Sequence, residues 1–155
     1  MNSELKKQYA MRITQANNVQ MIIISYEIIE TYLDEAIASG SKDIFAENAK
    51  LASRCIEEMM NNLHYEYDFA KALKEMYLYM KSRLRHAVWD DDKEAVKEVK
   101  KLVCGLKDSY MGVEDQDSSM PVMQNTQSVM AGMTYGRNQI LDEISQDVGN
   151  RGYRV

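Results

Sequence analysis

Two histidines and two cysteines are the side chains of this 155-residue chain whose chemistry points first to catalysis or metal binding. A di-iron site in a helical bundle requires Glu-x-x-His motifs, but Asn61 stands three residues before His64 and Arg83 three residues before His86. The sequence has no His-Glu-x-x-His motif and no phosphate-binding glycine loop. We expect both histidines to be solvated or to lie at helix ends, and we predict no enzymatic activity, no metal and no cofactor.

The cysteines and the N-terminal residues indicate a cellular compartment rather than a reaction. Cys55 and Cys104 fall on the apolar faces of expected helices, where we predict buried structural thiols rather than a disulfide or a redox pair. No signal-peptide pattern occurs near the N-terminus, and the apolar run at 21–24 is too short for a membrane span. The sequence therefore predicts a cytoplasmic protein without membrane insertion.

Composition and charge narrow the class further. The net charge is -5, and no Lys/Arg run is long enough to follow a phosphate backbone, so we expect no nucleic-acid partner. The chain has one proline, and residues 1–110 are rich in Ala, Leu, Lys, Glu and Met, which favour helix. Its length suits one domain with a proper core.

Four segments repeat apolar residues every three or four positions, which predicts amphipathic helices. The expected helices run from Asn18 to Ser39, from after Asp43 to Tyr65, from Asp68 to Trp89, and from Asp90 to about Tyr110. Asn17 and Asp68 are expected N-caps, and Gly40 is an expected C-terminal stop. Gly105 inside the last helix predicts close packing or a bend. Short connections make consecutive helices antiparallel neighbours, so we predict an all-α, up-down four-helix bundle.

Two of these helices have apolar faces that merit separate description. The first carries one seam of Ile22, Tyr26, Ile29, Leu33 and Ala36, and a second of Met21, Ile24, Ile28 and Tyr32. Two seams suit a helix that is buried on two sides. The expected core face of the third helix consists of Phe69, Leu73, Met76, Met80, Leu84 and Ala87. Tyr77 and Tyr79 lie beside that face, which suggests surface kept for a partner.

The boundaries of the expected units follow from these helices. We expect an N-terminal arm at 1–16, the bundle at 17–112, and a polar linker with a flexible C-terminal tail at 113–155. A short amphipathic helix can form at 137–147. Twelve methionines and ten tyrosines are many for a small helical domain, and both residue types serve adaptable binding surfaces. A protein-binding bundle is therefore favoured over an enzyme.

The order of short motifs resembles the FliS family of flagellar export chaperones over roughly residues 9–112. Residues 76–80, Met-Tyr-Leu-Tyr-Met, resemble the family's Leu-Tyr-x-Tyr-Met block, and residues 81–87 resemble its basic continuation. Residues 93–99 resemble the start of the family's fourth helix. Near the N-terminus, Tyr9 and Ile13 stand close to the family's tyrosine and valine.

This resemblance implies a chaperone that binds the C-terminal segment of flagellin, which is disordered in the monomer. Binding would cover apolar surface, prevent premature polymerisation and present flagellin for export through the flagellar secretion system. The arm at 1–16 would lie over the client groove through Tyr9 and Ile13. Other flagellar export or regulatory proteins are further implied partners.

The residues expected to bind the client are apolar positions beside or at the edge of the core seams, which we expect to face outward. They are Met60, Leu63, Tyr77, Met80, Leu84, Val96 and Val103. One alternative stays open, namely a helical adaptor or a homodimer that uses the same apolar surface for a different partner.

Overall fold

The structure, a computed structural model, describes residues 1–114, where helices joined by short connections are the only regular elements. The helices are α1 (Ser3–Gln15), α2 (Asn18–Ala38), α3 (Lys42–Asn61), α4 (Asp68–Asp90) and α5 (Lys93–Glu114). The all-α prediction is therefore confirmed for these residues. The helix expected at 137–147, with most of the predicted linker and tail, lies outside the described residues.

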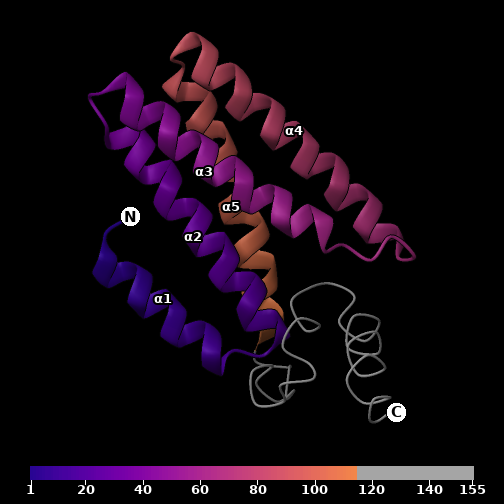
Figure 1. Cartoon of the computed structure of the whole chain (residues 1–155). Coiled ribbons are helices and arrows are strands. Elements are labelled where there is room, and N and C mark those ends of the chain that lie inside the picture. The colour runs from indigo at the N-terminus through magenta and orange to yellow at the C-terminus, as the bar shows by residue number, and fades with distance from the viewer. Residues whose placement is uncertain (115–155) are drawn as a thin grey trace, which may run out of the picture.

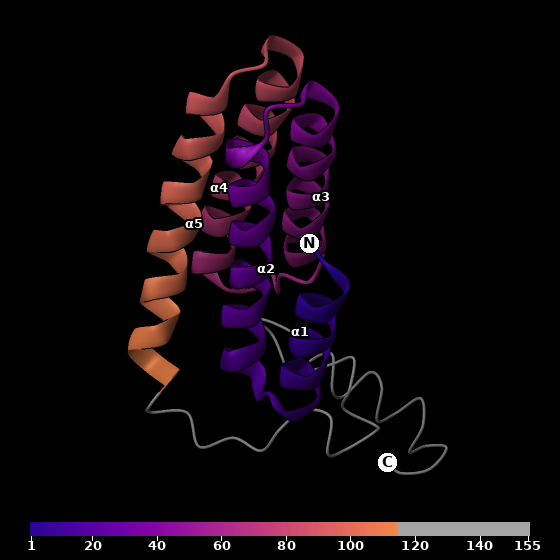
Figure 2. The ribbon, with the colours of Figure 1, turned by 90° about the vertical axis from the view of Figure 1, so that its left-hand side faces the viewer.

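The four longer helices lie side by side, as Figures 1 and 2 show. Helix α2 packs against both α3 and α5, α3 also packs against α4, and α4 packs against α5. These contacts form a closed ring with the core inside it. Helix α1 lies outside the ring, next to α2 (Figure 2).

Helix α2 begins where the sequence predicts. The Asn17 side chain accepts a hydrogen bond from the Gln20 backbone N–H at 2.9 Å, and the Gln20 side chain accepts one from the Asn17 N–H at 3.0 Å. This capping box satisfies two N–H groups that otherwise lack helical partners. The first expected seam of α2 is entirely buried in the core: Ile22, Tyr26, Ile29, Leu33 and Ala36.

A pair of tyrosines links α2 to α4 inside the ring. The hydroxyl groups of Tyr26 and Tyr77 lie 2.6 Å apart, and both side chains are fully buried. Tyr110 packs beside Tyr26 with ring centroids 5.9 Å apart, and burial raises the pKa of Tyr110 above its ordinary value. A hydrogen bond lets a buried hydroxyl keep its polar interaction while its ring fills core volume. Tyr77 is therefore a core residue.

The predicted core face of α4 is confirmed at Met80, Leu84 and Ala87, but it is shifted by one residue in the first half of the helix. Its buried residues are Ala70, Tyr77, Met80, Leu84 and Ala87. Phe69, which we expected in the core, is half exposed and stacks on Tyr67 with ring centroids 5.6 Å apart. A stripe read only as every third or fourth residue admits two neighbouring phases, and packing against α3 and α5 selects the one that contains Tyr77.

The helix ends differ from prediction in three places. Helix α2 ends at Ala38 and its C-cap Ser39 is extended, so Gly40 supplies no left-handed turn. Asp68 is the first residue of α4 rather than its N-cap, and no side chain caps that end. The last helix does not begin at Asp90 as expected, because Asp90 is the final residue of α4. Asp91 then takes the left-handed conformation (φ 57°), and the Asp92 carboxylate accepts hydrogen bonds from backbone N–H groups in the first turn of α5.

Two further expectations are not met, namely close packing at Gly105 and a solvated His64. Gly105 is exposed, and a Cβ built there would meet nothing within 4 Å, so the glycine permits no close approach. His64 is buried in the connection between α3 and α4, with Nδ1 3.3 Å from a Glu66 carboxylate oxygen. The short connection folds onto the end of the core and carries His64 with it.

Candidate binding face beneath α1

Helix α1 covers a small apolar cluster that is separate from the main core. No residue of α1 is buried, but Tyr9 and Ile13 are half-buried against α2. The buried members of the cluster are Ala16, Met21 and Ile24, with Ile28 packed beside them. Three members of the second expected seam of α2 therefore lie beneath α1, which confirms that α2 is covered on two sides.

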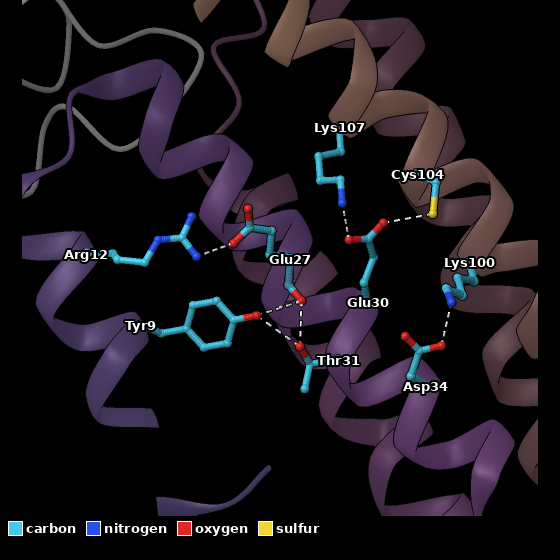
Figure 3. A network of polar contacts seen from close by, with 9 residues as sticks. All are labelled: Tyr9, Arg12, Glu27, Glu30, Thr31, Asp34, Lys100, Cys104 and Lys107. Atoms are coloured by element: carbon cyan, nitrogen blue, oxygen red, sulfur yellow. Dashed lines mark hydrogen bonds and ion pairs between the residues drawn. The ribbon is translucent and has the colours of Figure 1, made fainter. Parts of the chain in front are cut away.

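Polar contacts hold α1 in place along one edge of α2 (Figure 3). The Tyr9 hydroxyl lies 3.0 Å from the Thr31 hydroxyl and donates to the Glu27 backbone carbonyl at 3.4 Å. The Arg12 guanidinium donates to the Glu27 carboxylate at 2.5 Å, and this bond raises the pKa of Arg12. Half of the Arg12 side chain is exposed, so the ion pair contributes at most about 1 kcal/mol.

The opposite edge of α2 is bound to α5 by polar groups that are half-buried, apart from the exposed Asp34. Glu30 accepts a hydrogen bond from the Cys104 thiol at 2.8 Å and from Lys107 at 2.5 Å, and Asp34 accepts one from Lys100 at 2.5 Å (Figure 3). Burial, together with Glu30, raises the pKa of Cys104 to about 11. The thiol is thus a half-buried hydrogen-bond donor, not a buried structural residue or a reactive nucleophile.

A cavity of about 380 Å³ opens where the end of α1 meets α2 and the last turn of α5. Its lining combines apolar and charged side chains: Arg12, Gln15, Ala16, Gln20, Ile23, Ile24, Glu27, Met111 and Glu114. Gln20 donates a hydrogen bond to Glu114 at 3.3 Å, which ties α2 to α5 below it. The cavity continues the apolar face beneath α1 toward α5.

Most of the residues predicted to contact a client do not face outward. Six of them are buried in the main core: Leu63, Tyr77, Met80, Leu84, Val96 and Val103. Met60 alone among the seven is partly exposed, packed against the edge of that core. The outward orientation was wrong because each helix of a ring faces two neighbours, so positions on both flanks of a seam point inward.

The sequence reasoning also missed residues that the structure places on the surface. Arg12 and Glu27 were not singled out, since a charge pair between separate helices leaves no periodic signal. The exposed indole of Trp89 was missed because it followed the last expected core position of its helix. A lone tryptophan beside an acidic turn was the available signal.

The described residues show no site for an inorganic cofactor. No group of three or more His, Cys, Asp or Glu side chains within residues 1–114 is arranged to hold a metal ion. In the same part of the chain, every helix falls short of the length or apolarity needed to cross a bilayer. The structure has instead an apolar surface on α2 that helix α1 partly covers.

The family comparison covers most of the chain. The sequence matches the family model described as flagellar protein FliS over residues 1–117. A search of curated proteins returned no match. The matched residues include α1, the capping box of α2 and the whole ring of helices α2 to α5. The chain therefore belongs to the FliS family of flagellar proteins.

Proposed function

We propose that this protein is a cytoplasmic chaperone that binds the disordered C-terminal segment of flagellin, prevents its premature polymerisation and assists its export. Membership of the FliS family implies a flagellar export chaperone, and this is a chaperone family rather than an enzyme family. The observation that carries the finer proposal is the apolar stripe on α2 that α1 covers without burying any residue of its own.

The stripe suits a helical client segment. Removal of α1 would expose Met21, Ile24 and Ile28, which lie at helical spacing on one face of α2. An amphipathic segment can lay its own apolar side chains on such a face and fold as it binds. In this mechanism α1 is the N-terminal arm, Tyr9 and Ile13 are its contacts, and the client takes their place.

The ring can act as the preformed scaffold. No α1 residue belongs to the buried cluster of the main core, which is built from α2, α3, α4, α5 and the α3–α4 connection. A 13-residue helix is marginal by itself in water, so α1 depends on the ring far more than the ring depends on α1. The arm can therefore leave while the scaffold keeps its fold.

The residues first expected to bind the client divide between two roles in this proposal. Met60 is partly exposed and stays a proposed client contact. The other six shape the scaffold from within. Substitution of Tyr77 or Val103 by a charged residue should consequently abolish folding along with binding, because both side chains are fully buried.

Calorimetric titration with the C-terminal segment of flagellin from the same organism tests the proposal. We expect one-to-one binding with a dissociation constant of roughly 1 µM or lower and a large negative heat-capacity change, as coupled folding requires. No heat at high protein concentration would exclude flagellin as the client.

A matched pair of variants locates the binding face. Ile28→Asp places a charge on the stripe beneath α1, whereas Ile44→Asp places one at an exposed position of α3. Ile28→Asp should weaken flagellin binding about tenfold or more, and Ile44→Asp should leave it unchanged. Equal affinities would place the client elsewhere, and circular dichroism melts verify that both variants fold.

An aromatic patch next to the α3–α4 connection favours a second candidate, a homodimer or adaptor. Tyr65, Tyr67 and Phe69 are all partly exposed there, with Lys74 5.0 Å from the Tyr65 ring centre. Exposed aromatic groups of this kind are typical of protein interfaces. Light scattering separates the candidates: a mass that rises with concentration and ignores added flagellin supports self-association, whereas a stable monomer that binds flagellin one to one supports the chaperone.

A further inference from the structure

A second groove lies between α3 and α4, away from the face beneath α1. It has a volume of about 500 Å³. Its lining residues are Ala49, Lys50, Ser53, Glu57, Lys81, Leu84, Arg85, Val88 and Trp89. Figure 1 places α1 and α4 on opposite sides of α2 and α3. An occupant of this groove would therefore not compete with α1 for space.

Trp89 gives the groove an unusual apolar wall. It is the only tryptophan in the chain, and 88% of its surface is exposed, more than for any other large apolar residue within 1–114. It stands next to Val88, and Leu84 closes the floor of the groove one helical turn earlier. Tryptophan at the edge of a pocket is a frequent anchor of protein interfaces.

The charge of the groove is opposite to that of the protein. Its lining holds three cationic side chains and one carboxylate, although the whole chain carries a net charge of -5. Lys81 is paired with that carboxylate, Glu57, at 3.1 Å. Lys50 and Arg85 form no ion pair with any residue of the described part of the chain. The groove thus presents two unneutralised cations beside an exposed indole.

We propose that this groove docks a short acidic segment of a partner protein. The segment places one large apolar side chain between Trp89 and the floor at Leu84, and its carboxylates pair with Lys50 and Arg85. Charge complementarity selects an acidic partner, since a basic segment would meet like charge on both rims. The site goes beyond the proposed binding of flagellin, because client and partner can be held together.

A pair of designed peptides tests the chemistry on the full-length protein. One is a fluorescein-labelled amphipathic helix of leucine and glutamate, and the other is the same sequence with lysine at every glutamate position. We expect the acidic peptide to bind at least about tenfold more tightly and to shift the emission of Trp89 to shorter wavelength. Equal binding of the two peptides overturns the proposal.

Variants then place the acidic peptide in the groove. Lys50→Glu combined with Arg85→Glu, and separately Trp89→Ala, should abolish binding measured by anisotropy. The matched controls are Lys101→Glu, an exposed cation on α5, and Phe69→Ala, an exposed aromatic residue at the other end of α4. Unchanged affinity in the groove variants, or equal loss in the controls, overturns the proposal.

Two further outcomes separate the groove from neighbouring explanations. If the acidic peptide binds only after Asp115→Asn and Asp117→Asn, the chain's own acidic stretch fills the groove and the partner proposal fails. If the groove variants also lose flagellin binding, the groove is part of the client surface and the proposal again fails. Intact flagellin affinity in those variants supports a second site, and the peptide result stands even if flagellin does not bind.

Discussion

The two apolar faces of α2 show how one helix can serve permanent and conditional burial. The inner face is covered by neighbouring helices of the ring, and Tyr26 on that face is hydrogen-bonded to Tyr77 in α4. The outer face is covered by α1 through two half-buried side chains and a few polar contacts near the surface. Apolar periodicity is similar on both faces, so the difference lies in what covers them.

The contacts that cover the two faces of α2 differ in how much they contribute to the free energy of folding. Removing a large side chain from a closed core costs about 3–5 kcal/mol, because the surrounding helices cannot collapse into the gap. A half-buried contact at the surface contributes far less, and the helix that makes it can move away. The inner face therefore determines whether the chain folds, and the outer face is available for exchange.

Tyr77→Ala should have the largest effect, because it removes a fully buried ring and the hydrogen bond to Tyr26. We expect a loss of about 3–5 kcal/mol in the free energy of unfolding, measured by urea denaturation. Tyr79→Ala is the matched control, since Tyr79 is 47% exposed two positions away, and it should cost a small fraction of that. Similar losses in both would contradict the assignment of Tyr77 to the core.

Ile13→Asp should disrupt the packing on the outer face of α2 and leave the inner face intact. A charge in the contact between α1 and α2 should release α1, so its amides should exchange with deuterium as in an unfolded peptide. Global stability should change by at most about 1 kcal/mol, because the ring does not need α1. Flagellin affinity should rise, since the competing cover is gone.

Gln8→Asp, on the exposed side of α1, is the control for this release. It should leave the amide protection of α1 in place. Cooperative unfolding of the whole chain in Ile13→Asp would show that the outer face is as essential to the fold as the inner one.

Gly105→Ala should stabilise the ring by about 1 kcal/mol, because alanine favours helix and a Cβ there meets nothing within 4 Å. The thermal midpoint should rise while the exchange of α1 amides stays unchanged. That outcome would show that the stability of α5 and the attachment of α1 are independent. A fall in the midpoint would mean that the glycine has a packing role.

The smallest expected effect concerns the polar contacts between α2 and α5. It is measured as the alkylation rate of Cys104 in a Cys55→Ala background. Burial, and then Glu30, raises the pKa of Cys104 from 9.0 to about 11, so alkylation should be slow at pH 8. Glu30→Gln should lower this pKa and speed alkylation. The raised pKa also means that this group stabilises the fold below about pH 9 and that its contribution is lost toward pH 11. An unchanged rate in Glu30→Gln would contradict the hydrogen bond.

The sequence predicted the four helices of the ring and the inner seam of α2, because periodicity reports which side of a helix is apolar, but it predicted only an arm where α1 is helical. It also predicted the Asn17 cap, since capping depends on neighbouring residues alone. It could not choose between Met76 and Tyr77 for the core of α4, because that choice depends on the helices packed around it. The candidate site was harder still, since exposure at Met60 or Trp89 is a property of the assembled ring.

The two-residue connection between α1 and α2 has a consequence for the timing of release. Ala16 and Asn17 are both buried, and Ala16 is extended, so the C-terminal end of the displaced helix stays tethered next to its docking face. A tether this short gives an effective local concentration on the order of millimolar. A client must outcompete that concentration continuously, so once the client is pulled away, α1 reoccupies the stripe before a second client can diffuse to it.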